Sequence, residues 1–246
     1  MNLRGIGIFR KELNNAFSSL VAYIVIIVFL IITGLFVWVF PQTSIIEFGF
    51  SNIDPLFNIA PYVYLFLIPA ITMRAFAEEK KAGTMELLLT KPLTDWQIIL
   101  GKYFANFLLV IFALLPTLIY YYSVYRLGSP EGNIDSAAVV GSYIGLFLLG
   151  AVFTAIGIFA SSITDNQIVA FILAVFFCFV LYEGFTSLSA IDTWGEFSYF
   201  ISQLGIDYHY NSVSKGLLDS RNFIYFLSVI VIMLQCTKLK LGSRKW

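Results

Sequence analysis

Six long apolar runs constrain this chain more than any other feature of its sequence. A helix that crosses a bilayer needs about 20 mostly apolar residues, and the runs are continuous rather than alternating, which excludes a closed β-barrel. Only 12% of the residues are charged, against about 25% in a soluble domain. The sequence predicts an all-α membrane protein, with one transmembrane domain over residues 1–246. Its six transmembrane helices are expected at residues 20–40, 56–73, 103–122, 138–160, 168–188 and 222–237.

The basic residues indicate which ends of these helices face the cytoplasm. Placing both termini inside puts twelve of the 15 Lys and Arg residues on the cytoplasmic side, in agreement with the positive-inside rule. Those twelve are Arg4, Arg10, Lys11, Arg74, Lys80, Lys81, Lys91, Lys102, Lys238, Lys240, Arg244 and Lys245. Only Arg126, Lys215 and Arg221 fall in outer loops. The sequence therefore predicts a multi-pass protein with both termini cytoplasmic.

An amphipathic stretch precedes the first crossing, within residues 1–18. Its apolar residues recur at helical spacing, with charged and amide side chains off that stripe. The stripe consists of Leu3, Ile6, Phe9, Leu13 and Phe17. Two interpretations are open: an interfacial helix in the headgroup plane, or the cytoplasmic lead-in of the first crossing.

The segment 74–102 holds the densest run of charge in the chain, between the second and third crossings. Thr94 and Gln97 fit a capping box, so a helix is expected to begin there and run into the third crossing. Asp54 and Pro55 are expected as the N-cap and N1 residues of the second crossing. A charge-rich loop of this length predicts a short amphipathic helix at the cytoplasmic face, where a soluble partner can push on it.

The sequence lacks the common patterns of enzymes and metal sites. It has no GxxxxGK[ST] loop, no HExxH, no CxxC pair, no GxSxG and a single histidine, His209. Neither catalytic residues, a metal site nor a cofactor of its own is therefore expected, and the chain is not expected to be an enzyme.

Two features inside the crossings bear on packing and function. Gly141 and Gly145 form a GxxxG spacing in the fourth crossing, which favours close helix packing within the bundle over a dimer face. Glu183 is the only carboxylate within the crossings. An ionisable group at that depth is often functional, but Glu183 lies near the outer end of its helix, which favours a side chain that reaches the interface or caps an outer helix over a functional one.

The outer segment 189–221 is too long for a structureless loop. Its aromatic and aliphatic residues between Trp194 and Leu204 are amphipathic enough to dip back into the membrane. A re-entrant lid over a transport path and a surface helix that seals the bundle are both open.

Four segments resemble the permease subunits of ABC-2 type ATP-binding-cassette transporters. They are Glu78-Glu79 with the GTMELLL run at 83–89 and Pro92, the SSITDNQ break at 161–167, the HYNSVSKGLLDSR segment at 209–221, and the RKW ending at 244–246. Tyr210 stands where the family usually has phenylalanine. Within the family, the layout is most similar to the gliding-motility-associated permease of the GldF type. The permease linked to nitrous oxide reductase maturation is the alternative.

The resemblance implies a permease that works beside a second permease copy or a companion membrane subunit in a bacterial inner membrane. Each would engage a cytoplasmic ABC ATPase subunit, which binds the ATP and Mg. Residues 77–92 would form the coupling helix, with Gly83 allowing a turn. The coupling residues implied are Glu78, Glu79, Gly83, Thr84, Met85, Glu86, Leu87, Leu88, Leu89 and Pro92.

The resemblance also implies that the second and fifth crossings line the transport path. Candidate path residues are Asn58, Tyr62, Tyr64, Phe177, Phe179 and Tyr182, together with Glu183. The function expected first is ATP-driven export linked to gliding motility or secretion. An ion-coupled transporter would need a charge relay, for which Glu183 alone is thin support. A force-transmitting subunit without a substrate would show the same coupling segment.

Overall fold

The computed structural model describes residues 3–48, 51–85, 93–191, 195, 197–217 and 219–243. Every regular element within these ranges is helical, and six segments are long and apolar enough to span a membrane, which confirms the all-α six-span prediction. The elements are α1 (Leu3–Ser18), α2 (Leu20–Trp38), α3 (Ile45–Phe48), α4 (Asp54–Thr72), α5 (Arg74–Lys81), α7 (Asp95–Leu114), η1 (Leu115–Thr117), α8 (Leu118–Leu127), α9 (Ser136–Ile163), α10 (Gln167–Phe179), η2 (Val180–Gly184), α11 (Phe185–Ser189), α12 (Phe197–Gln203), α13 (Ile206–Ser214) and α14 (Ser220–Gly242).

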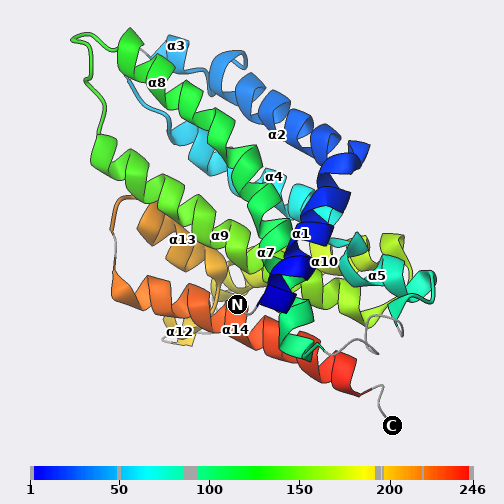
Figure 1. Ribbon diagram of the computed structural model, residues 1–246. Helices are drawn as coiled ribbons and strands as arrows, with labels where there is room; N and C mark the ends of the chain where they lie inside the picture. The colour runs from blue at the N-terminus through cyan, green and yellow to red at the C-terminus, as the bar shows by residue number, and fades with distance from the viewer. Residues whose placement is uncertain are drawn as a thin grey trace.

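The helix α9 runs through the middle of the bundle and packs against α4, α10, α13 and α14 (Figure 1). Its glycines allow this close approach. A Cβ on Gly157 would lie 2.0 Å from Thr72 Oγ1, and one on Gly141 would lie 2.8 Å from Gly216 Cα. Such distances are well below van der Waals contact, so the small-residue stretch packs inside the bundle, as its spacing predicts.

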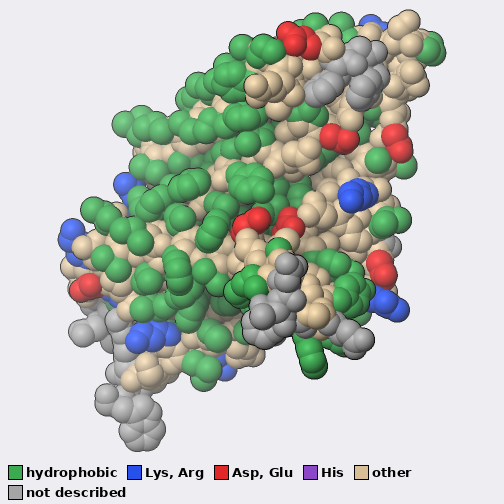
Figure 2. All heavy atoms as spheres, turned by 180° about the vertical axis from the view of Figure 1, so that it is seen from behind, with side chains coloured by type: hydrophobic (Ala, Val, Ile, Leu, Met, Phe, Trp, Pro, Cys, Tyr) green, Lys and Arg blue, Asp and Glu red, His purple; other side chains and the backbone are tan. Residues whose placement is uncertain are grey.

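The outermost spans leave apolar side chains on the surface. Only 22% of the apolar window of the fifth span, Gln167–Ser189, and 22% of that of α14, is buried within the bundle, against 83% for α9. Hydrophobic side chains also cover much of the face seen in Figure 2. An apolar surface of this extent suits lipid or another transmembrane chain rather than water.

The helix α1 is separate from the first span. The chain breaks at Ser19, whose hydroxyl caps α2 by accepting a hydrogen bond from the Val21 amide at 3.3 Å. From this break α1 turns away from α2 and packs along α7, with Ile8 buried (Figure 1). It is therefore a helix in its own right and not a straight lead-in to the first crossing.

Local capping residues set the helix boundaries. The capping box at Thr94 is confirmed: Gln97 N donates to Thr94 Oγ1 at 3.4 Å, and Thr94 N donates to Gln97 Oε1 at 3.1 Å. The predicted N-cap at Asp54 is wrong by one residue. The Asn52 side chain accepts from Asp54 N at 2.7 Å, so the helix already includes Asp54, and Ile53 is the N-cap. The sixth span, Ser220–Gly242, is longer than residues 222–237 because Asp219 caps its start and its last turn is polar.

The outer segment is structured, as its length predicts, and its two described helices differ. The helix α13 packs on α9, where it buries Ile206, Tyr210 and Val213, and Tyr210 donates to the Phe57 carbonyl at 2.7 Å. The His209 ring stacks on Tyr225 of α14 at 3.9 Å between centroids. The helix α12, by contrast, has no buried residue in its described length. The described aromatic residues of α12 therefore lie at the surface, whereas α13 packs into the bundle.

Candidate functional site

The joint between α4 and α5 is held by a serine from another span. The helix ends at Thr72, and α5 restarts after Met73 without a side-chain cap of its own. Instead, Ser161 Oγ at the end of α9 accepts from Phe76 N at 3.0 Å and from Ala77 N at 3.1 Å. The same hydroxyl donates to the Met73 carbonyl at 2.9 Å. Because first-turn amides of a helix lack partners within it, Ser161 takes the place of a capping side chain at the start of α5 and fixes α5 to α9.

The far end of α5 is a tight turn. Gly83 has a φ of 67°, in the left-handed region that favours glycine. Ala82 N donates to the Glu78 carbonyl at 2.9 Å and Thr84 N to the Glu79 carbonyl at 3.0 Å, which closes the helix. The turn predicted at Gly83 is thus present, although the second helix expected beyond it falls mainly outside the described residues.

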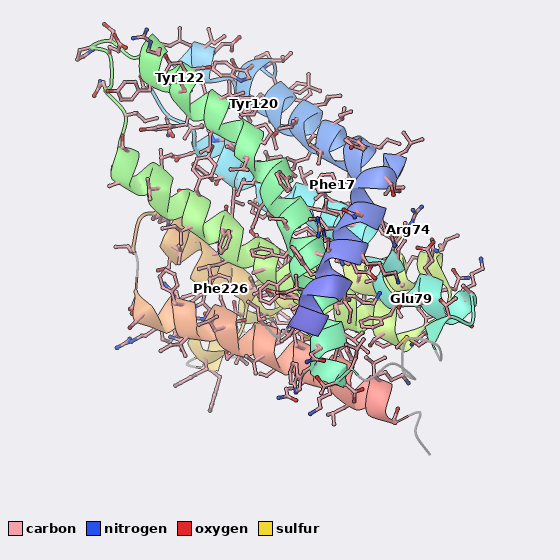
Figure 3. All side chains as sticks on the ribbon, in the orientation of Figure 1. Phe17, Arg74, Glu79, Tyr120, Tyr122 and Phe226 are labelled. Atoms are coloured by element: carbon pink, nitrogen blue, oxygen red, sulfur yellow. The ribbon has the colours of Figure 1, made fainter. Side chains whose placement is uncertain are left out.

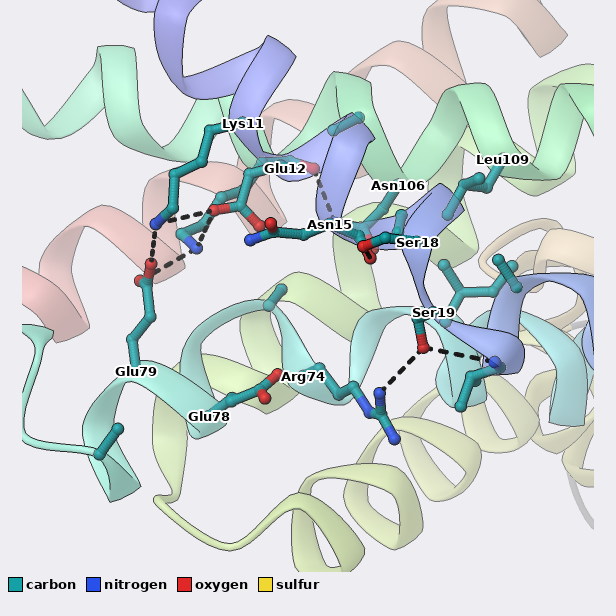
Figure 4. Close-up of a pocket in the computed structure, with 18 of the residues that line it drawn as sticks. Lys11, Glu12, Asn15, Ser18, Ser19, Arg74, Glu78, Glu79, Asn106 and Leu109 are labelled. Carbon is teal, nitrogen blue, oxygen red and sulfur yellow. Dashed lines mark hydrogen bonds and ion pairs between the residues drawn. The ribbon is translucent and has the colours of Figure 1, made fainter.

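Glu79 lies at the α5 end of the bundle (Figure 3), and it is one of four charged side chains that join α5 to two other helices (Figure 4). We call Lys11, Glu12, Glu79 and Lys102 the charge cluster. Lys102 of α7 is only 1% exposed, and its Nζ lies 2.9 Å from Glu12 Oε1 of α1 and 3.0 Å from Glu79 Oε2 of α5. Lys11 Nζ lies 3.2 Å from Glu79 Oε1. A buried lysine between two carboxylates ties the three helices together, because losing any one partner leaves an uncompensated charge.

The predicted coupling residues divide into an anchored set and an exposed set. Glu79 belongs to the charge cluster and faces α1 and α7, and Met85 is buried. Glu78, Gly83 and Thr84 are exposed at the tip. Glu86, Leu87, Leu88, Leu89 and Pro92 lie outside the described residues. Among the described coupling candidates, only Glu78, Gly83 and Thr84 are therefore exposed to a partner.

The predicted path residues also divide into two sets. Tyr64 and Tyr182 lie in the core, where Tyr64 packs on Phe29 at 5.4 Å between ring centroids. Asn58, Tyr62 and Phe179 are exposed, whereas Phe177 and Glu183 are intermediate. Tyr62 meets Tyr182 edge-on at 6.0 Å between centroids, which brings α4 and the fifth span together at this point. These residues do not converge on one cavity.

Glu183 lies in an unusual turn that the sequence does not signal. Residues Val180–Gly184 form a π-helical turn within the fifth span, a feature often found at functional sites. Close by, Asp207 Oδ1 accepts from Asn211 at 2.8 Å, and burial raises the pKa of the Asp207 carboxyl above its usual range. Within the described part of the chain, no group of three or more His, Cys, Asp or Glu side chains is arranged to hold a metal.

The site residues predicted from the sequence do not include three residues that hold α5 in place, namely Ser161, Lys102 and Glu12. Lys102 and Glu12 are 90 positions apart, and Ser161 is 84 or 85 positions from the amides that it caps. No local pattern pairs residues at such separations. The one signal in the sequence that could have indicated a buried ion pair is Lys102, a charged residue that follows an apolar stretch in α7.

The comparisons with known proteins agree with this architecture. The model of the family described as ABC-2 family transporter protein matches residues 6–237, which include five spans, most of the sixth and most of α1. No curated protein matches the chain. Because the family match covers nearly the whole sequence, the chain belongs to the ABC-2 transporter family and is a transmembrane permease subunit.

Proposed function

We propose that this permease is driven by a separate cytoplasmic ABC ATPase, which binds the ATP and Mg and docks at the tip of α5. The observation that carries the proposal is the combination of an anchored body and an exposed tip in the eight-residue helix α5 and the turn that follows it. Glu78 and Thr84 are exposed, whereas Ser161 and Lys102 bind the same helix to α9 and α7. A push on the tip would therefore reach two spans directly.

The proposal includes an orientation with α5 and both termini in the cytoplasm of a bacterial inner membrane. Arg74 and Glu79 lie at the α5 end of the bundle, whereas Tyr120 and Tyr122 lie toward the other end (Figure 3). The concentration of basic residues at the α5 end supports this orientation under the positive-inside rule. The permease works as a pair, in which the other member is a second permease copy or a companion membrane subunit.

A matched pair of charge reversals tests ATPase docking. Lys81 is exposed on the tip, and Lys215 is exposed at the other end of the bundle. Lys81→Glu is expected to lower co-purification of the ATPase in mild detergent several-fold, because a charge reversed at an interface rim repels its partner. Lys215→Glu should leave recovery unchanged. Full ATPase recovery with Lys81→Glu, and also with Glu86→Ala combined with Leu87→Lys, would refute docking at this segment.

We further infer that the transported material leaves along the fifth span, in export linked to gliding motility or secretion. The support is the resemblance of the chain to permeases of the GldF type and the half-buried Glu183 in its π-helical turn. Deleting the gene from its source bacterium is expected to abolish surface gliding. Intact gliding with a loss of growth on nitrous oxide would favour the alternative maturation permease.

A further inference from the structure

A cavity of about 510 Å³ lies between α1, the start of α2, α5 and α7 (Figure 4). Its volume is within the range of about 300–1,000 Å³ that is usual for ligand sites. One end of the cavity is formed by the charge cluster, in which the two lysines and the two glutamates are paired. The other end is formed by Arg74 and the break at Ser19. The charge available to a ligand is therefore at the Arg74 end.

Arg74 has hydrogen-bonding capacity to spare. Its Nη1 donates to Ser19 Oγ at 3.3 Å. Its Nε is buried and has no acceptor among the described residues. A guanidinium group binds a phosphate through two parallel N–H donors, and the positive end of the α2 dipole lies beside it at Ser19. This end of the cavity is suited to a phosphodiester.

A carboxylate stands one helical turn from Arg74 on the same helix. Glu78 also lines the cavity, and no ion pair joins it to Arg74 or to another described residue. Residues four apart on a helix have Cβ atoms about 5–6 Å from each other. The pair thus places a cation and an anion on one face of α5, which is the arrangement that a headgroup with a phosphate and an ammonium group requires.

Part of the remaining wall of the cavity is apolar and belongs to the spans, namely Val21, Ala22, Ile71, Ala105 and Leu109. The polar side chains Asn15, Ser18, Thr84 and Asn106 also line the cavity. Arg74 directly follows the span α4, so the charged end of the cavity is at the level where the hydrocarbon core gives way to headgroups. A ligand that fits both parts has a charged head and an apolar tail.

We propose that this cavity binds a phospholipid with an ethanolamine headgroup, its phosphate on Arg74, its ammonium group at Glu78 and the start of its acyl chains on the apolar wall. The lipid would fill the space between α1 and α5 and so support the helix pair that the charge cluster joins. The inference does not depend on which face of the membrane α5 occupies or on an ATPase.

Native mass spectrometry of the detergent-purified, delipidated protein tests the proposal. Added palmitoyl-oleoyl-phosphatidylethanolamine is expected to remain bound to the wild-type chain. Arg74→Gln should weaken retention about tenfold, as expected for the loss of a charge-assisted pair of hydrogen bonds. Arg126→Gln is the matched control, because Arg126 is exposed and pairs with Glu131 at the other end of the bundle; it should retain the lipid as the wild type does.

Two further arms identify the headgroup and the source of the phosphate. Glu78 is exposed, so Glu78→Gln should fold normally; it is expected to weaken retention of phosphatidylethanolamine but not of phosphatidylglycerol, which lacks the ammonium group. Glycerophosphoethanolamine, which lacks acyl chains, should bind far more weakly than the lipid. Equal retention by wild type, Arg74→Gln and Glu78→Gln would overturn the proposal. Equal binding of the chain-free ester would overturn its lipid part.

Discussion

Replacing Lys102 by methionine is expected to destabilise the protein by about 3 kcal/mol. Breaking a buried ion pair by removing one partner costs about 3–5 kcal/mol. Lys102 is 1% exposed, and Glu12 and Glu79 are 15% and 14% exposed, so both carboxylates would lose their shortest cation contact in a poorly solvated place. The lower end of the range applies because Lys11 stays within 3.2 Å of Glu79 and 3.8 Å of Glu12.

Thermal unfolding in mild detergent measures this loss. For a chain of this size, 1 kcal/mol shifts the midpoint by roughly 2–4 °C, so Lys102→Met should lower it by about 6–12 °C. Lys240→Met removes an exposed lysine at the end of α14 and should change stability by less than about 1 kcal/mol. The two variants remove the same charge, so their difference reports burial and pairing.

A triple variant separates the electrostatic explanation from a packing explanation. Replacing all members of a buried ion network by neutral groups of similar size is often nearly neutral. Glu12→Gln and Glu79→Gln added to Lys102→Met should therefore recover most of the lost stability. If the triple variant is no more stable than Lys102→Met alone, or if Lys102→Met matches the wild type, the cluster does not join the helices as argued.

Three further substitutions probe other contacts. Gly157→Ala should sharply reduce the yield of folded protein, because the added Cβ would lie 2.0 Å from Thr72 Oγ1. In the control Gly7→Ala, the added Cβ meets nothing within 4 Å, and the change should stabilise α1 by up to about 1 kcal/mol. Equal yields of the two variants would contradict the packing of α9 on α4. Ser161→Ala leaves two buried amides without their acceptor and should cost at least about 2 kcal/mol in an unfolding measurement, whereas Ser228→Ala on the surface should cost little. Burial raises the pKa of Asp207 above its ordinary value of 3.8, so the folded state holds that proton more tightly and the Asp207 contribution to stability falls as the pH rises from about 3.8 through the raised pKa. Asp207→Asn should therefore be stabilising at neutral pH and less so at pH 4, and a pH-independent difference between the two unfolding midpoints would exclude this explanation.

Local sequence patterns gave the six spans, the start of α7 at the Thr94 capping box and the turn at Gly83. Each depends on residues within a few positions of one another: an apolar run, a side chain that reaches back three residues, or a glycine that tolerates a positive φ. The predicted N-cap at Asp54 was wrong by one residue, because the Asn52 side chain accepts from the Asp54 amide and Asp54 is already the first residue of the helix. These features needed no knowledge of the rest of the chain.

Tertiary structure alone decided which of the predicted site residues act together. Hydropathy places Tyr62 and Tyr64 on one span but cannot tell that Tyr64 is buried and Tyr62 exposed, because that depends on where α2 packs. Likewise, the sequence marks Glu79 as a surface charge of a coupling loop, whereas Lys102, 23 positions further on, and Lys11, 68 positions before it, make it part of a buried cluster. Ion pairs and caps between helices depend on distance in space, and only the packing of the spans brings such residues within hydrogen-bonding distance of each other.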